Sequence, residues 1–383
     1  MKQGWEIKKL GEVSEIINGG TPKTKVSAYW DGDIYWITPA DLGKLTKIIV
    51  NDTPRKITDL GLEKSSAKLF PENSIILSTR APIGHLAINS VPMSTNQGCR
   101  GIVPIKNVDT WFIYYFLKKN VELLNTLGTG ATFKELSTKA LAGIEIPIPP
   151  LYEQQRIVSI LDKVFTAIDK TKANAEQNLK NACEVFDSYL KGVFENRNWK
   201  TKKIEEVCNE IFAGGDAPKD NFSAELNENH KIPIFANAVK DRGLYGYTNF
   251  SRVTQSCVTI SARGSGTGHT ELRNEPFLPI VRLIVCIPDT RQITTDFLKY
   301  AIDNLVIQRS GSAIPQLTVP MIRDYLIPVP SINEQLKLIG KAEYIYAETQ
   351  KLEAIYQKKL DCLEELKKSV LQKAFAGELI EDV

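Results

Sequence analysis

Two long stretches of the chain carry apolar or small residues at intervals that alternate between four and three. One stretch follows Glu153 and the other follows Glu334, and no proline interrupts either. In the first stretch, polar Thr171 and Asn178 occupy two positions where a strict heptad requires an apolar residue. The recurring positions are Ile157, Leu161, Val164, Ile168, Ala175, Ala182, Tyr189 and Val193 in the first stretch, and Leu338, Ala342, Ile345, Thr349, Tyr356, Leu363, Val370 and Ala374 in the second. This spacing is typical of a coiled-coil seam. It predicts two helices of about 42 residues, each about 63 Å long at 1.5 Å per residue.

The segments that precede these stretches have a different pattern, with short runs rich in β-branched residues. Such runs are typical of buried strands. The predicted strands are Ser74–Arg80, Arg100–Ile105, Cys257–Ser261 and Ile280–Ile287, and predicted helices cover Thr110–Phe116 and Thr295–Ala301. Each segment is therefore predicted to be a mixed domain of short strands and helix.

One phrase occurs twice and shows that the chain is an internal repeat. "IEIPIPPLYEQQRI" begins at Ile144 and "YLIPVPSINEQLKL" begins at Tyr325. The shared residues are Pro147, Pro149, Glu153 and Gln154 in the first copy and Pro328, Pro330, Glu334 and Gln335 in the second, all 181 positions apart. A Pro-x-Pro run is extended and cannot be helical, whereas Glu-Gln before an apolar 4–3 pattern predicts a helix start.

The repeat extends over the whole chain. Trp5 corresponds to Trp199, the Gly19-Gly20 pair to Gly214-Gly215, and "STRAPIGH" to "SARGSGTGH". We therefore predict an α+β protein with two mixed α/β domains in a tandem pseudo-two-fold repeat, separated by two long helices that run antiparallel so that their seams bury each other. The predicted boundaries are residues 1–150 (first domain), 151–197 (central helical spacer), 198–330 (second domain) and 331–383 (distal helical spacer).

Composition narrows the class of protein only a little. The hydrophobic fraction of 43% suffices for real cores, and the net charge of +3 is a weak signal for an anionic partner. No apolar run reaches the ~18 residues of a membrane span, and we find no secretory signal pattern. The six cysteines lie far apart at Cys99, Cys183, Cys208, Cys257, Cys286 and Cys362, which predicts reduced thiols and a cytoplasmic location.

The sequence motifs that suggest chemistry are weak. "GSGTGH" (Gly264–His269) is glycine-rich but lacks the Gly-Lys-Ser/Thr ending of a phosphate loop. His85 and His269 each follow a glycine at corresponding positions, where a turn residue, a metal ligand or a general base are all open readings. No arrangement of residues identifies a nucleophile or a zinc site. We predict a non-catalytic binding protein with two binding domains and a helical spacer.

Four segments together resemble one known family. They are "LGEVSEIINGGTPKT" (Leu10–Thr24), "YWDGDIYWITPADL" (Tyr29–Leu42), the doubled Pro-x-Pro phrase, and "LQKAFAGEL" (Leu371–Leu379). Over essentially its whole length the chain resembles the specificity (S) subunit of type I restriction–modification systems. "FAGGDAPKD" (Phe212–Asp220) departs from the Gly-Gly-Thr-Pro pattern of the first copy.

The resemblance implies a host-defence function and a set of partners. Two target-recognition domains would each read half of a split, asymmetric sequence in double-stranded DNA, and the helical regions would dock two methyltransferase (M) subunits. Restriction (R) subunits would join the complex through the M subunits. The chain would hold no cofactor, since S-adenosylmethionine, ATP and Mg²⁺ belong to the partner subunits. The sequence features at the helix starts predict that Glu153, Gln154, Glu334 and Gln335 bind the M subunits.

Polar residues in corresponding loops are the predicted DNA contacts. The lysines would bind phosphates, which position a protein without reading sequence, whereas arginines suit guanine and the amides suit adenine. The candidates are Lys23, Lys25, Arg80, Asn96, Gln97, Lys219, Arg263 and Arg273. Two alternatives from other classes remain, a two-headed protein-binding scaffold and an independent nucleotide-using enzyme.

Overall fold

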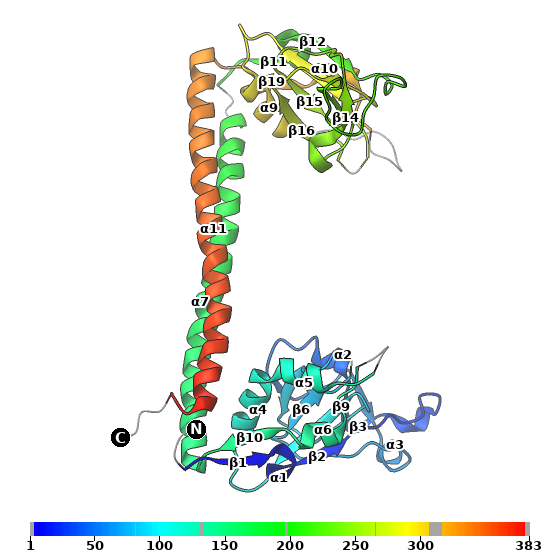
Figure 1. Ribbon diagram of the computed structural model, residues 1–383, viewed down its shortest axis with the longest axis vertical. Coiled ribbons are helices and arrows are strands. Elements are labelled where there is room, and N and C mark those ends of the chain that lie inside the picture. The colour runs from blue at the N-terminus through cyan, green and yellow to red at the C-terminus, as the bar shows by residue number, and fades with distance from the viewer. Residues whose placement is uncertain are drawn as a thin grey trace. The chain divides into compact units, whose positions relative to one another are not determined.

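The computed structural model describes residues 4–80, 82–130, 134–195, 198–264, 266–305 and 316–379. The chain divides into two compact units, one made of Met1–Ala175 with Lys358–Val383 and the other of Glu176–Gln357. Within each unit, a mixed domain lies beside stretches of both long helices (Figure 1).

The first domain is built from a five-stranded sheet, a three-stranded sheet, a two-stranded sheet and short helices. Its strands are β1 (Glu6–Lys9), β2 (Ser14–Asn18), β3 (Trp30–Ile37), β4 (Ile49–Val50), β5 (Arg55–Ile57), β6 (Ile75–Ser78), β7 (Leu86–Asn89), β8 (Met93–Thr95), β9 (Cys99–Pro104) and β10 (Glu145–Ile148). Its helices are α1 (Leu10–Val13), α2 (Pro39–Leu42), α3 (Asp59–Glu63), α4 (Thr110–Lys119), α5 (Val121–Leu127) and α6 (Thr138–Ala142). The strand order is β2-β9-β6-β7-β4 in the larger sheet and β5-β3-β8 in the smaller, while β1 pairs with β10.

The larger sheet is buried on both faces. Alternate side chains of β6 point to opposite faces, so Ile75 and Leu77 pack with Phe112 and Ile113 of α4. Ile76 packs on the other side, in the cluster that contains residues of β3 and β8. This helix–sheet–sheet layering explains why β6 has no polar alternation in its sequence.

The second domain repeats this plan. Its strands are β11 (Thr201–Lys203), β12 (Cys208–Ala213), β13 (Ile232–Phe235), β14 (Leu244–Thr248), β15 (Cys257–Ile260), β16 (Thr270–Arg273), β17 (Leu278–Pro279), β18 (Ile284–Pro288) and β19 (Leu326–Pro328). Its helices are α8 (Ile204–Val207), α9 (Thr295–Asp303) and α10 (Val319–Asp324). The sheets have the orders β12-β18-β15-β16 and β14-β13-β17, and β11 pairs with β19.

The two predicted long helices are present. Helix α7 spans Leu151–Phe194 and α11 spans Ile332–Ala376. In the first unit Lys172 pairs with Glu364 and Asp169 with Lys367, at 2.7 and 2.5 Å. As the residue number rises along α7, the number of its partner in α11 falls, so the two helices run antiparallel within this unit. The seam predicted from the 4–3 spacing includes buried Ile157, Leu161, Ile168 and Ala175.

The same direction holds within the second unit. The hydroxyl of Tyr189 donates to the carbonyl of Leu338 at 3.3 Å, and the rings of Phe186 and Tyr346 stack edge to face at 5.3 Å. Here too the residue numbers run in opposite directions along α7 and α11. Among the described residues no helix combines the length and the hydropathy needed to cross a membrane.

The glutamine of the repeated phrase attaches each long helix to its domain. The Gln154 amide oxygen accepts from the Asp109 amide at 2.8 Å, and its nitrogen donates to the Pro149 carbonyl at 2.8 Å. The Gln335 amide makes the equivalent bonds to Thr294 (2.9 Å) and Pro330 (2.9 Å). Because both glutamines are fully buried, they satisfy backbone groups that would otherwise be unpaired at these junctions.

One predicted strand is shorter in the structure. Strand β18 begins at Ile284 and not at Ile280. The residues before it form a turn in which Val281 and Arg282 have φ of 50° and 61°. The apolar run Ile280–Ile287 therefore contains a tight turn. Its β-branched composition is typical of a strand and did not predict this turn.

Candidate nucleic-acid interface

Four loops of the first domain meet at one edge of the larger sheet. Strand β2 ends at Asn18, opposite Arg100 near the start of β9, and β6 ends at Ser78, opposite Cys99. The segments that leave β2 and β6 and the turn that enters β9 are therefore neighbours. The segment around Glu135 joins them through its bridge to Arg80.

Close backbone contact at this edge requires glycine. A Cβ on Gly19 would lie 1.9 Å from the Asn96 carbonyl oxygen, closer than any side chain allows. The Asn96 side chain accepts from the Gly98 amide at 2.9 Å, which fixes the 95–98 turn. The Gln97 amide accepts from the Thr21 hydroxyl at 2.5 Å. The two predicted adenine-reading amides thus lie side by side, each with one local hydrogen bond.

Arg80 is held by a carboxylate. Its guanidinium donates to one oxygen of Glu135 at 3.2 Å and 2.5 Å, while Arg100 lies 3.6 Å from the other oxygen. Burial lowers the pKa of Arg100, and the charge of Glu135 opposes that shift. The first domain therefore balances two guanidinium charges with one carboxylate at this edge.

The predicted phosphate-binding lysines are exposed. Lys23 and Lys25 follow the Gly19-Gly20 pair, and Lys219 follows Gly214-Gly215 at the corresponding place. Their side chains extend from the loops that leave β2 and β12. Their role as DNA contacts stays a prediction.

The second domain has the same frame. A Cβ on Gly214 would lie 2.6 Å from the Pro279 carbonyl carbon. Arg263 bridges to Gln316 as Arg80 bridges to Glu135. The Asn237 side chain accepts from the backbone amides of Ala262 and Arg263 and donates to the Arg263 carbonyl at 2.8 Å, so it fixes the end of β15.

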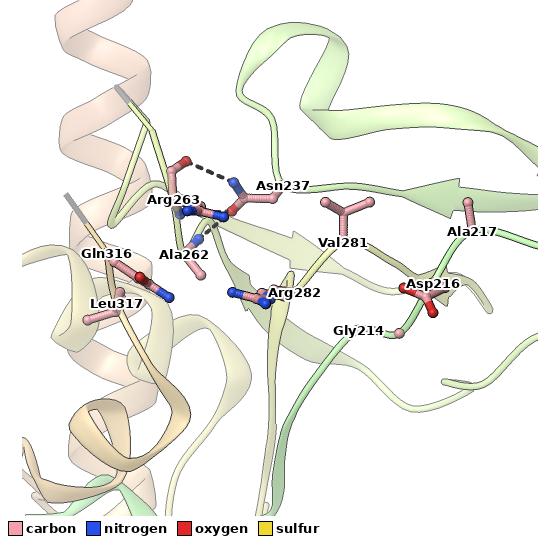
Figure 2. A pocket seen from close by; sticks show the side chains of 11 residues that line it. Gly214, Asp216, Ala217, Asn237, Ala262, Arg263, Val281, Arg282, Gln316 and Leu317 are labelled. Carbon is pink, nitrogen blue, oxygen red and sulfur yellow. Dashed lines mark hydrogen bonds between the residues drawn. The ribbon is translucent and has the colours of Figure 1, made fainter. Parts of the chain in front are cut away.

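These loops enclose a pocket of about 400 Å³ within the second domain. Figure 2 shows Arg263 and Gln316 on one side of the pocket and Asp216 on another, with Arg282 between them. Arg282 and Val281 were absent from the predicted site, because the sequence pattern placed them inside a strand. Successive positive φ angles at non-glycine residues, which sequence does not reveal, are common at functional sites.

Arg273 does not belong to this surface. Its side chain is 1% exposed, and its guanidinium lies 3.6 Å from the centre of the Phe235 ring. It donates to Thr259 at 3.3 Å and to the Arg242 carbonyl at 2.5 Å. Burial lowers its pKa to about 10. The prediction that Arg273 contacts DNA is therefore wrong. Its side chain packs and forms hydrogen bonds inside the domain.

Replacing this buried arginine should destabilise the second domain. Arg273→Ala removes two hydrogen bonds and the packing on Phe235, which predicts a loss of about 2–4 kcal/mol in the free energy of unfolding. Urea unfolding of the full chain measures this change. Lys231→Ala, at an exposed residue of the same domain, is the control and should change little. Equal stability of the two variants would contradict the structural role of Arg273.

The predicted partner-binding residues fall into two groups. Gln154 and Gln335 are the buried residues described above, so they offer no free surface. Glu153 is also buried, whereas Glu334 is exposed and accepts from the Trp199 indole at 3.2 Å. A docking role for the four residues stays a prediction, and the structure gives the glutamines a separate structural role.

In the second domain, the histidine that follows a glycine, His269, contacts a neighbouring carboxylate. His269 Nε2 lies 3.1 Å from a carboxylate oxygen of Glu271. The other carboxylate oxygen of Glu271 pairs with Arg242 at 2.9 Å. Within the described ranges, His, Cys, Asp and Glu form no cluster of three that could hold a metal ion. His269 therefore shares the Glu271 carboxylate with Arg242.

The sequence model of the type I restriction modification DNA specificity domain matches this chain twice, over residues 2–181 and 196–373. This chain belongs to that family. It is a specificity subunit, the non-catalytic DNA-recognition subunit of a type I system. The family and the tandem repeat predicted from the sequence are thereby confirmed.

Curated relatives of this specificity subunit come from distant organisms. The Type I restriction enzyme MjaIX specificity subunit of Methanocaldococcus jannaschii is 27% identical over 412 residues, covering 98% of this chain and 93% of the relative. The EcoR124I/EcoR124II specificity subunit of Escherichia coli is 35% identical over 191 residues, covering 48% of this chain and 46% of the relative.

Solved structures share the fold of the specificity subunit. The HsdS subunit from Thermoanaerobacter tengcongensis aligns with a TM-score of 0.68 and 18% identity over 99% of this chain and 98% of that chain. A chain from work on complex assembly and conformational transition of the type I R-M system aligns with a TM-score of 0.76 and 19% identity, over 99% of both chains. These likenesses confirm the predicted fold class, with two mixed domains and two long helices.

Proposed function

We propose that this specificity subunit reads an asymmetric two-part sequence in double-stranded DNA, one part with each domain. The observation that supports this best is the pair of corresponding loop clusters, which share a frame and differ in side chains. Both clusters are built around a Gly-Gly pair and an arginine that ends a buried strand. Different side chains on the same frame would read different bases.

The long helices provide the proposed connection to catalysis. Two M subunits dock on the helical regions and R subunits attach through them, in a cytoplasmic complex. S-adenosylmethionine, ATP and Mg²⁺ would be held by those partners. Two half-site interactions on one chain combine through effective concentration, so neither has to be strong alone.

Co-expression with a methyltransferase subunit tests the function directly. The purified complex should methylate adenine within one two-part sequence, and mapping of the modified adenines in treated DNA would give that sequence. A stable complex that binds DNA without any sequence preference would contradict the proposal.

The exposed lysines of the first domain should act without sequence preference. Lys23→Ala combined with Lys25→Ala removes two proposed phosphate contacts, and each contact contributes about 0.9 to the slope of log K against log salt. We expect weaker binding to every duplex, a slope smaller in magnitude by nearly two, and an unchanged methylation sequence. Affinity measured from about 50 to 200 mM salt gives the slope.

A matched double variant controls for the loss of charge. Lys9 and Lys106 are exposed at the opposite end of the β2–β9 pair. Lys9→Ala with Lys106→Ala should leave the salt slope nearly unchanged. Equal slopes for the two double variants would show that the Gly-Gly loop does not contact the DNA backbone.

A further inference from the structure

The two domains differ in charge at equivalent positions of their loop clusters. In the first domain Glu135 pairs with Arg80 at 2.5 Å. In the second domain the residue that bridges to Arg263 is Gln316, which is neutral. Among the described residues, no carboxylate forms an ion pair with Arg263 or Arg282. None of the ion pairs that the described residues form therefore neutralises these two guanidinium groups in the second pocket.

Arg282 occupies a position that is glycine in the first domain. The Cys99 amide donates to the Asn96 carbonyl at 3.1 Å, and the Leu283 amide donates to the Ile280 carbonyl at 3.1 Å. These equivalent turns place Val281 at the position of Gln97, and Arg282 at the position of Gly98. Both tip residues therefore change between the domains. The turn itself also changes conformation, because φ is positive at Val281 and Arg282 but not at Gln97 or Gly98.

The backbone holds Arg282 in an unfavourable conformation. Val281 and Arg282 have φ of 50° and 61°, a region that β-branched and long side chains rarely adopt. Their amides donate to the carbonyls of Gly215 (2.7 Å) and Gly214 (3.1 Å), which fixes the turn. Glycine would fit this position without strain, and a strained non-glycine residue of this kind points to a function for its side chain.

Resting on the proposed function, we infer that Arg282 is a specificity-determining residue that binds a guanine in the second half-site, with Arg263 supplying a second positive group in the same pocket. The planar fork of arginine donates to O6 and N7 of guanine, the commonest specific contact in the major groove. Phosphates are the same in every half-site, so a phosphate contact would not need to differ between the domains. Asp216 lines the pocket without an ion pair to either arginine in the described residues.

The test uses the complex with its methyltransferase subunit and the site mapped for the wild-type chain. Each base pair of the second half-site is replaced in turn, and affinity is measured for every duplex. We expect the wild-type complex to prefer guanine at one position by about ten- to one-hundred-fold. Arg282→Gly should abolish that preference, and glycine at φ 61° keeps the turn intact.

A conservative variant separates base reading from phosphate binding. Arg282→Lys keeps the charge and loses the fork, so it should retain the salt slope and lose most of the preference for guanine. Arg291→Ala is the matched control, because Arg291 lies beyond the other end of β18. It should leave the preference unchanged.

Three outcomes would overturn the inference while leaving the proposed function standing. One is a mapped second half-site without a G·C pair, and another is a guanine preference that survives Arg282→Gly. The third is a loss by Arg282→Gly of the same factor on every duplex, with a salt slope smaller by about 0.9, which would identify a phosphate contact. A wild-type complex without any sequence preference would refute the proposed function instead.

Discussion

Exchanging the first domain for that of another specificity subunit should change one half of the methylated sequence and leave the other half as it was. The proposed exchange covers residues 1–150 and ends in the extended Pro149-Pro150 segment before α7. The second domain has its own sheets and its own core cluster. Its loop cluster should therefore keep its geometry when the first domain is replaced.

The exchange will succeed only if the donor preserves the packing between domain and helices. In the first unit Phe112 and Phe116 of α4 stack on Phe375 of α11 at 5.0 and 5.5 Å, and Tyr115 stacks on Phe165 of α7 at 5.5 Å. Losing one such buried aromatic ring costs about 3–5 kcal/mol. A donor with large apolar residues at the α4 positions is therefore required.

Mapping of methylated adenines in DNA treated with the hybrid complex measures the outcome. The hybrid should recognise the donor's first half-site together with the original second half-site. As a control, reinstalling the native residues 1–150 in the hybrid must restore the original sequence. A change in both half-sites would show that the domains do not read DNA independently.

The long helices were predictable because their signal is repeated many times. A 4–3 apolar spacing over about six heptads averages out single exceptions such as Thr171, and the observed helices begin at Leu151 and Ile332, close to the Glu-Gln pairs. The mixed domains were predictable as a class from short β-branched runs. Their sheet order depends on contacts between distant segments, which one sequence does not reveal.

The site was only partly predictable, for different physical reasons at each residue. Arg80 and Arg263 were predicted because each ends a buried strand, and the structure places them in corresponding loops. Arg273 has the same position at the end of β16, yet its side chain turns inward over Phe235. Arg282 was missed because its strand-like neighbours hid a turn that depends on hydrogen bonds to Gly214 and Gly215. The direction of a side chain and the sign of φ are consequences of tertiary structure.

Lengthening both long helices by one heptad should lengthen the gap between the half-sites. The insertions follow Ala175 in α7 and Tyr356 in α11, and seven residues keep the 4–3 seam in register. A heptad adds about 10.5 Å at 1.5 Å per residue, which equals about three base pairs at roughly 3.4 Å each. We expect unchanged half-sites separated by about three more base pairs.

The longer complex should also bind less tightly. Three base pairs rotate the second half-site by about 100°, since DNA has roughly ten pairs per turn, so the DNA or the protein must twist to restore both contacts. Mapping of methylated adenines gives the new gap, and a titration with the matching duplex gives the affinity. Inserting two residues in place of seven in both helices is the control. Two residues turn the following part of each helix by about 200°, which moves the apolar seam away from its partner and should abolish methylation at any spacing. If the heptad variant methylates at the original spacing with undiminished affinity, the length of the helices does not set the gap.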